Sequence, residues 1–382
     1  MSQTNMDACY FCTTPFQILS SLSLVQAMGE RADLYIMPQF AQAEEYAEKV
    51  RKTGAFRHVK VVDEPGIMHT YMKSKNHLIN HLEIARSYLF VDEIAKVVLE
   101  PGVFYRKMYV SSRAYTGRVV QMHFIKRRVP TEVIYFDDGE GSYVNDATYK
   151  PRKTDAIVRQ ILFGKKANDT NHPKYLYSPA FYHSLNPGTE HEDVRLLPFF
   201  TDAKDRDQYI NSVFNYTDEQ NIPENIIILD TLRDGFEPGL NQFILGIYGE
   251  VAKSGGESGV TIKRHPRDDS PKEPGYRYYT NTSVPFEVLC MNMNMEQKVL
   301  VAISSTATVI PKMLLDQEPY VIMLYKLTDR FQGKEPAARR YYEQCRNIYR
   351  CKERFMIPET MEELREDLRR VKEMADSWRA KG

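Results

Sequence analysis

The sequence is poor in cysteine and has no long apolar run, and both shortages limit what the protein can be. Five cysteines occur in 382 residues, too few and too scattered for the disulfide framework of a secreted protein. Cys9 and Cys12 form a CxxC spacing inside an apolar run, but residues three apart on a strand point to opposite faces. We therefore expect a reducing compartment, with neither a redox pair nor a zinc site at these cysteines.

Membrane spans and net charge are lacking as well. No apolar run approaches the roughly 18 residues that a span needs, and the first residues lack the charged and apolar regions of a signal peptide. The 51 basic residues balance 51 acidic ones, which gives no reason to expect a nucleic-acid partner. Basic clusters at 126–128 and 165–166 would suit an anionic surface or would be solvated loop charges. We expect a cytoplasmic protein that could make a peripheral contact with the inner face of the membrane.

What the sequence does contain is a regular alternation of apolar runs and helical patterns, typical of an α/β protein. The apolar runs predict strands at 7–12, 32–37, 58–62, 107–111 and 132–136, and again at 225–230, 259–264, 297–303 and 319–324. Such alternation implies parallel strands joined by right-handed crossovers. The polar segment 201–224 separates the two series. We therefore predict two domains, 1–200 and 201–382, the second ending in a helix over 358–378.

Three predicted strands end in polar residues, at the position where α/β proteins bind ligands. The strand 132–136 ends in Asp137, Asp138 and Gly139, and glycine lets the backbone turn sharply or approach a substrate closely. We expect these carboxylates not to belong to the core. The other two strands end in residues suited to binding phosphate, namely His265 with Pro266, and Ser304, Ser305 and Thr306.

Two doubly wound domains facing one another across a cleft form the GT-B architecture of nucleotide-sugar glycosyltransferases, and the motifs resemble one group of these enzymes. Residues 136–139, Phe-Asp-Asp-Gly, resemble the acidic-acidic-glycine motif of bacterial sialyltransferases. His265-Pro266 and Ser304-Ser305-Thr306 resemble their His-Pro and Ser-Ser/Thr motifs. The order of these motifs, with the segments 197–200 and 226–229, is similar to the lipooligosaccharide sialyltransferase family, glycosyltransferase family fifty-two. The likeness covers most of the chain.

The resemblance implies an inverting transfer of sialic acid from CMP-sialic acid to a sugar hydroxyl of a cell-surface glycan, such as a galactoside. It implies no metal and no other cofactor. Departure of CMP leaves negative charge on its phosphate while the acceptor hydroxyl loses a proton. The site therefore needs several phosphate-binding groups and one base. The resemblance also implies a homodimer.

The expected donor-binding residues each have a competing interpretation. His265, projected by the following Pro266, is expected to contact the phosphate, although it could be a surface histidine in a basic turn. Ser304, Ser305 and Thr306 are expected to contact the same anion, although Ser305 or Thr306 could be ordinary N-caps. Glu287 either accepts hydrogen bonds from the ribose hydroxyls of CMP or is a first-turn acid favoured by the helix dipole.

The resemblance offers two locations for the base. In the broader sialyltransferase group an acid of the acidic-acidic-glycine motif takes the proton, here Asp137 or Asp138. In the lipooligosaccharide family the base is an aspartate after the first strand of the second domain, for which Asp234 is the nearest match. We favour Asp234 as base and expect Asp138 to position the acceptor. Both aspartates could instead have only a local structural role in a loop or at a helix cap, which is the usual role of an aspartate beside a glycine.

Acceptor contacts are expected from Thr14 and Gln17, which follow the first strand, and from Gly139. Three other functions remain compatible with the sequence. A transferase of the same fold that uses a UDP-sugar would need more phosphate-binding groups. In a phosphoesterase, Asp137, Asp138 and His265 would bind a metal ion. A non-catalytic module of glycan assembly would keep its function when His265 is replaced.

Overall fold

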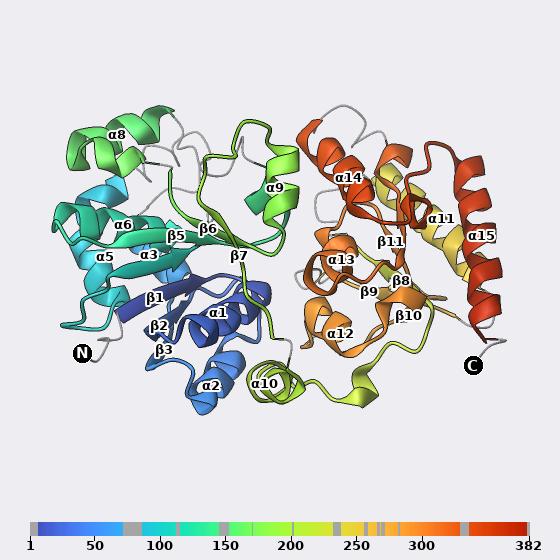
Figure 1. Ribbon diagram of the computed structural model, residues 1–382, viewed down its shortest axis with the longest axis horizontal. Helices are drawn as coiled ribbons and strands as arrows, with labels where there is room; N and C mark the ends of the chain where they lie inside the picture. Colours follow the sequence, from blue (N-terminus) through green and yellow to red (C-terminus); the bar gives the residue numbers. More distant parts are fainter. Residues whose placement is uncertain are drawn as a thin grey trace. The chain divides into compact units, whose positions relative to one another are not determined.

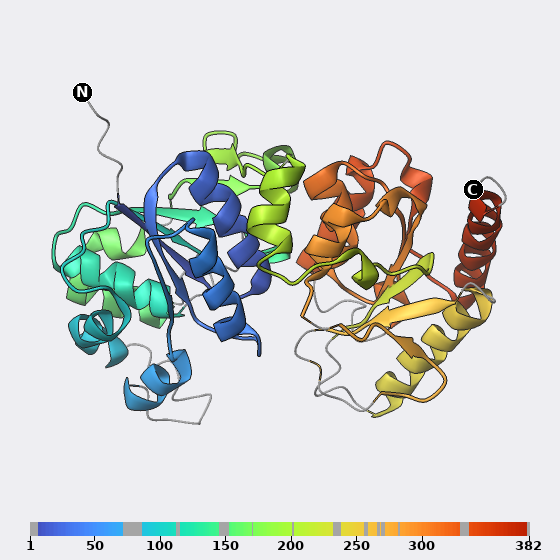
Figure 2. The same ribbon diagram turned by 90° about the horizontal axis from the view of Figure 1, so that it is seen from below.

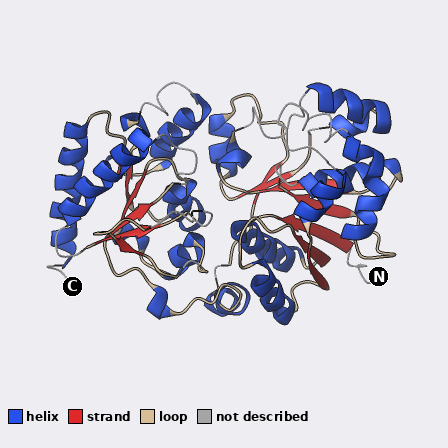
Figure 3. Ribbon diagram, turned by 180° about the vertical axis from the view of Figure 1, so that it is seen from behind, coloured by secondary structure: helices blue, strands red, loops and turns tan. Residues whose placement is uncertain are grey.

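The computed structural model folds into two units, which divide after Val213. Each unit contains one parallel β-sheet with helices on both faces (Figures 1 and 3). The residues that the structure describes are 7–71, 86–111, 115–144, 153–169, 171–200, 202–231, 238–255, 259–265, 268, 272–281, 283–328 and 336–379. No helix within these ranges is long and apolar enough to cross a membrane.

The sheet of the first unit has seven strands in the order β3-β2-β1-β4-β5-β6-β7. All of its pairings are parallel. This is the strand order of the doubly wound nucleotide-binding fold with one strand added, and it reverses direction between β1 and β4. The strands are β1 (Asp7–Cys12), β2 (Arg31–Ile36), β3 (His58–Val61), β4 (Lys107–Val110), β5 (Glu132–Phe136), β6 (Lys174–Leu176) and β7 (Val194–Leu196).

Helices cover both faces of this sheet, which explains why its central strands are continuous apolar runs rather than alternating ones. Alternate residues of β1, such as Cys9 and Phe11, pack with α5 and α6 in one buried cluster, while α1 and α2 lie on the opposite face (Figure 1). The helical segments of this unit are α1 (Pro15–Met28), α2 (Ala43–Thr53), α3 (Glu64–Tyr71), η1 (Tyr88–Phe90), α5 (Val91–Val98), α6 (Tyr115–Lys126), α7 (Glu140–Tyr143), α8 (Lys153–Phe163), η2 (Lys165–Asn168) and α9 (Pro179–Leu185).

The boundary between the units falls thirteen residues later than the predicted one at 200. The segment expected to be a polar connection begins with α10 (Ala203–Arg206) and the π-helical turn η3 (Asp207–Asn211). The turn packs against α1 and α2, and Ile210 is fully buried. Because these contacts lie within the first unit, the part of the segment up to Val213 belongs to that unit despite its charged composition, and the part from Phe214 belongs to the second unit.

The second unit contains a six-stranded sheet in the order β10-β9-β8-β11-β12-β13, again all parallel. Its order is the doubly wound one, with the reversal between β8 and β11. The strands are β8 (Ile226–Leu229), β9 (Val260–Lys263), β10 (Arg277–Tyr278), β11 (Val299–Ala302), β12 (Tyr320–Met323) and β13 (Phe355–Met356).

Two long helices, α11 and α15, cover one face of this second sheet (Figure 2). Their apolar side chains form a single buried cluster with alternate residues of the strands, for example Ile228 and Ile262. The helical segments are η4 (Asp218–Gln220), α11 (Pro238–Gly255), α12 (Phe286–Asn292), η6 (Met295–Gln297), η7 (Thr306–Val309), α13 (Ile310–Leu315), η8 (Tyr325–Leu327), α14 (Pro336–Ile348), η9 (Lys352–Arg354) and α15 (Met361–Arg379).

Candidate functional site

The predicted donor-binding residues follow three adjacent strands of the second sheet. Leu229 of β8 is level with Lys263 of β9, and Ile228 is level with Val301 of β11. His265 lies two residues beyond the position on β9 that is level with Leu229. Ser304 likewise lies two residues beyond the position on β11 that is level with Leu229. Since neighbouring strands lie ~4.8 Å apart, the two segments flank the end of β8 at a separation of about 10 Å. They lie at the carboxyl edge of the sheet beside the reversal of strand order, which is the usual ligand-binding edge of this fold.

His265 is partly buried just beyond β9. Its carbonyl oxygen accepts a hydrogen bond from the amide of Asp268 at 3.0 Å, which turns the chain back after the strand. Arg264 is held by Asp268 at 3.1 Å rather than pointing freely into solvent. Pro266 lies outside the described residues.

Lys263, the last residue of β9, is a feature that the sequence argument overlooked. Its ammonium group is almost completely buried, donates to the carbonyl of Val284 at 3.2 Å and lies 4.9 Å from the ring centre of Tyr279. Burial lowers its pKa to about 8, against the opposing effect of the nearby Glu287 carboxylate. The signal was present in the sequence as a lysine ending the strand Val-Thr-Ile-Lys, which has apolar residues at alternate positions.

Glu287 lies in the first turn of α12, as predicted, and is partly buried. Burial raises the pKa of its carboxyl group, while its own backbone amide and Lys263 act in the opposite direction. The Glu287 carboxylate therefore interacts with a buried cation, and the residue also lies in the first turn of a helix. Both interpretations offered for Glu287, ribose binding and a first-turn acid, remain compatible with this position.

The serine motif follows β11 and leads into η7, a 3₁₀ helix that continues directly into α13. Ser304 shares a hydrogen bond of 3.2 Å with the hydroxyl of Tyr342 on α14. Ser305 occupies the N-cap position, yet its side chain makes no capping hydrogen bond. Capping alone therefore does not account for Ser305. Thr306 is partly exposed beside it.

The strand between these segments, β8, is followed by Asp230, whose amide continues the ladder to the carbonyl of Lys263 at 2.9 Å. The buried hydroxyl of Tyr248 on α11 donates to the Asp230 carboxylate at 2.9 Å. Asp230 is thus a buried link between the sheet and α11. Asp234, the favoured base, lies outside the described residues.

The predicted acceptor residues share an edge of the first sheet in the same way. Phe11 of β1, Val110 of β4 and Tyr135 of β5 are level with one another. Thr14 and Asp138 each lie three residues beyond this row. The two residues therefore lie at the same carboxyl edge, about two strand spacings of ~4.8 Å apart.

Asp137 contradicts the expectation that these carboxylates stay out of the core, because it is only 2% exposed. Its carboxylate accepts hydrogen bonds from the amide of Gly139 at 2.9 Å, the hydroxyl of Tyr143 at 2.6 Å and the amide of Tyr177 at 3.1 Å. These donors come from α7 and from the end of β6. Asp137 ties the two loops together, a structural role that a buried acid can fill once all its bonds are made.

The titration of Asp137 gives a testable pH dependence. Burial raises the pKa of this carboxyl group from 3.8 to about 6 in the folded protein. A raised folded-state pKa contributes stability that is complete below about pH 4 and lost as the pH rises through about 6. We expect the free energy of unfolding of the wild type, relative to Asp137→Asn, to fall by about 3 kcal/mol across this range. Urea unfolding of both proteins at several pH values measures this difference, and a constant difference would contradict the assignment.

Asp138 is partly buried and differs from its neighbour. The hydroxyl of Ser142 donates to its carboxylate at 2.8 Å and accepts from its amide at 2.9 Å. Gly139 follows with φ 97° and ψ −149°, a backbone conformation open essentially only to glycine. The glycine of the motif is therefore explained by the turn into α7, and its contact with an acceptor stays a prediction.

Thr14 and Gln17 both have local structural roles at the start of α1. The Thr14 hydroxyl is the N-cap and accepts from the amide of Gln17 at 3.3 Å. The buried Gln17 amide oxygen accepts from the backbone amide of Thr13 at 2.6 Å. These bonds fix the turn after β1, and acceptor binding by either residue stays a prediction.

Among the described residues, no three His, Cys, Asp or Glu side chains gather as a metal would require. The sequence does contain one His-x-x-x-His spacing, at His77 and His81, which lies outside the described ranges. Metal independence stays a prediction.

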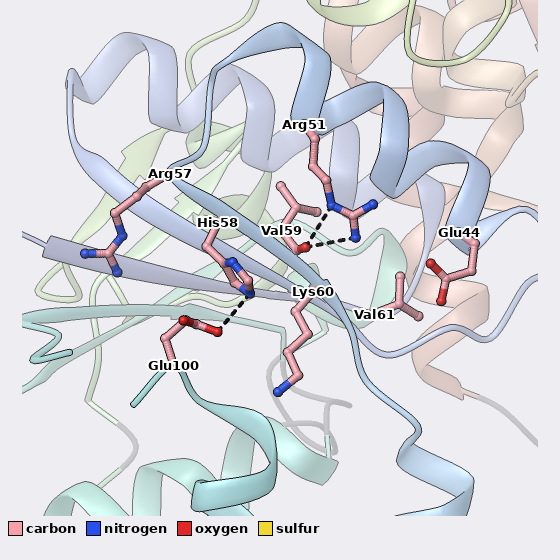
Figure 4. Close-up of a pocket in the computed structure, with 8 residues that line it drawn as sticks. All are labelled: Glu44, Arg51, Arg57, His58, Val59, Lys60, Val61 and Glu100. Carbon is pink, nitrogen blue, oxygen red and sulfur yellow. Dashed lines mark hydrogen bonds and ion pairs between the residues drawn. The ribbon is translucent and has the colours of Figure 1, made fainter. Parts of the chain in front are cut away.

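An open pocket of about 460 Å³ lies along the edge strand β3 and contains none of the predicted residues (Figure 4). His58 pairs with Glu100 at 3.1 Å, and the Arg51 guanidinium donates to the carbonyl of Val59 at 3.0 and 3.1 Å. Arg57 and Lys60 bind Asp33 and the carbonyl of Val97, which lie outside the lining of the pocket. The pocket therefore adds nothing to the predicted site.

No protein-family model matches the sequence, and no curated protein matches it. Among solved structures, the chain is similar to the glycotransferase of kitacinnamycin, with 12% identity, a TM-score of 0.52 and coverage of 100% of this chain and 96% of that one. It is also similar to a UDP-GlcNAc 2-epimerase from Methanocaldococcus jannaschii, with 12% identity, a TM-score of 0.45 and coverage of 97% and 92%. The first similarity, with the two doubly wound sheets, confirms the predicted GT-B fold. Identity this low establishes the fold alone, and the resemblance to family fifty-two stays a prediction.

Proposed function

We propose that the protein is an inverting glycosyltransferase that transfers sialic acid from CMP-sialic acid to a hydroxyl of a cell-surface glycan, without a metal. The observation that carries this proposal is the common edge of β9, β8 and β11. His265, the segment containing Asp234 and the serine motif all follow these three neighbouring strands at the reversal of strand order. A GT-B fold supports a nucleotide-sugar donor at such an edge.

The chemistry divides between these groups. His265 and the hydroxyls of Ser305 and Thr306 would bind the phosphate of CMP and stabilise the negative charge that grows there as the bond to sialic acid breaks. Glu287 would accept hydrogen bonds from the ribose hydroxyls. Asp234 would take the proton from the acceptor hydroxyl as that oxygen attacks the anomeric carbon from the opposite side.

The first unit would supply the acceptor contacts. Asp138 is the candidate of its motif that remains partly exposed, whereas Asp137 is committed to three internal hydrogen bonds. We therefore assign the positioning of the acceptor to Asp138, together with Thr14, and assign Asp137 to holding the loop.

Thermal-shift measurements with CMP and UDP, each with and without EDTA, test the donor class. The proposal expects a larger stabilisation by CMP that survives the chelator, since the ligand stabilises the state that binds it. A larger shift with UDP would favour a UDP-sugar transferase of the same fold. A shift that EDTA abolishes would favour a metal-dependent phosphoesterase.

The buried Lys263 predicts how CMP binding depends on pH. Its pKa of about 8 means that it carries its charge at pH 7 and loses most of it by pH 9, which removes its favourable interaction with the Glu287 carboxylate. We expect the dissociation constant of CMP to rise by about tenfold over this range, because a charged contact is worth roughly 1.5–3 kcal/mol when intact and part of it is lost. Titration calorimetry at several pH values measures the change.

Two variants separate this effect from general changes with pH. Lys263→Met should bind CMP weakly and with little pH dependence. Lys253→Met is the matched control, because Lys253 is largely exposed on α11 and pairs only with Glu250 in the described part of the chain. A pH profile that Lys263→Met leaves unchanged would remove Lys263 from the donor site.

A further inference from the structure

One face of α8 is apolar and exposed, and neither the core nor the predicted site accounts for it. Ile157, Ile161 and Leu162 are 59%, 76% and 40% exposed, although large aliphatic side chains are usually buried. Ile157 and Ile161 lie one helical turn apart and so share a face. Figure 1 shows α8 at the periphery of the first unit.

The helix is firmly anchored through its other side. Val158 and Phe163 pack on the buried cluster of the first unit, and the ring of Phe163 lies 6.0 Å from that of Tyr88. Arg159 is turned inward, where its guanidinium donates to Asp155 at 2.8 Å and to the carbonyl of Ala167 at 3.2 Å. The exposed face therefore belongs to a fixed helix.

Around this face three lysines outnumber two acids, Asp155 within α8 and the exposed Asp169 after η2. Lys153, Lys165 and Lys166 are exposed at its two ends, and none forms an ion pair with any residue that the structure describes. Asp155, the acid within α8, is already paired with Arg159 at 2.8 Å. An apolar face bounded by free lysines complements a surface that presents negative charge above an apolar layer.

We propose that α8 and η2 dock on an anionic lipid bilayer, with α8 lying parallel to the membrane plane. Ile157, Ile161 and Leu162 enter the boundary between headgroups and acyl chains, while Lys165 and Lys166 contact lipid phosphates. A second protein fits less well, because three side chains on an eleven-residue helix cover far less than the ~800 Å² per partner of a stable interface. α8 belongs to the first unit and the proposed donor residues belong to the second, so the inference does not depend on the sugar transferred.

Co-sedimentation of the full chain with vesicles tests the proposal, using phosphatidylcholine alone and phosphatidylcholine mixed with phosphatidylglycerol. The wild type should bind the mixed vesicles more tightly, and added salt should weaken that binding. The double variant Ile157→Ser/Ile161→Ser should lower the affinity by about tenfold or more. Lys165→Gln/Lys166→Gln should lower the affinity for the mixed vesicles by roughly thirtyfold and leave binding to neutral vesicles unchanged.

The matched control is Leu196→Ser, which removes an aliphatic side chain that is 66% exposed on β7 of the same unit. It should bind vesicles as the wild type does, and circular dichroism should show that all variants stay folded. Equal binding by the wild type and the isoleucine variant would overturn the proposal. A second result would also overturn it. In that result, light scattering shows that the wild type is a dimer and the isoleucine variant a monomer, and the wild type does not bind vesicles.

Discussion

Replacing His265 with alanine is expected to lower kcat/KM for CMP-sialic acid by roughly 30- to 1000-fold, equivalent to about 2–4 kcal/mol of transition-state stabilisation. The imidazole lies at the end of β9, beside the reversal of strand order, where an anion bound across β8 would meet both His265 and the serine motif. Its partial burial strengthens a charged contact by excluding water. Steady-state kinetics with varied donor concentration measures the loss.

His58→Ala provides a matched control for this substitution. His58 lies on the edge strand β3 and pairs with Glu100 at 3.1 Å, away from the carboxyl ends of the central strands. Its removal should leave kcat/KM within about twofold, since surface substitutions of this kind have small effects. Undiminished transfer by His265→Ala would remove the phosphate contact on which the proposed function depends.

The second large effect is expected from the base. Asp234→Asn should retain CMP binding while lowering kcat by about 10²-fold or more, because the amide cannot accept the proton of the acceptor hydroxyl. Asp234 follows Leu229, the end of β8, by five residues in the sequence, and β8 lies between the strands that carry His265 and Ser304. Single-turnover measurements with saturating donor separate the chemical step from binding.

Asp138→Asn and Asp137→Asn distinguish the two locations of the base. Asp138→Asn should mainly raise KM for the acceptor, whereas Asp137→Asn should act on stability through the bonds to Gly139, Tyr143 and Tyr177. If Asp138→Asn alone loses turnover and Asp234→Asn stays active, the base belongs to the Asp-Asp-Gly motif. That result would move the proton acceptor to the first unit.

Strands with strong apolar runs were predictable from sequence almost to the residue. The run at 7–12 is β1 (Asp7–Cys12), and the run at 132–136 is β5 (Glu132–Phe136). Both are inner strands with helices on both faces, so most of their residues are buried and the apolar run is almost continuous. The GT-B fold follows from this alternation, and the comparison with solved structures confirms it.

Very short strands and side-chain burial were not predictable in the same way. The strands β6, β7 and β13 have only two or three residues each, too few for an alternation to be visible. The burial of Asp137 depends on donors from Tyr143 and from Tyr177, forty residues away in the sequence. Lys263 likewise depends on Val284, so its position in the site emerges only when β9 and α12 are folded together.

The measurement that tests the central claim most directly is the release of CMP from CMP-sialic acid, with and without galactoside acceptors and in the presence of EDTA. The proposed function predicts CMP release that depends on the acceptor, with a sialylated product detected by mass spectrometry and both signals lost in His265→Ala. The absence of acceptor-dependent CMP release across the panel, together with consumption of a UDP-sugar by the same preparation, would contradict it.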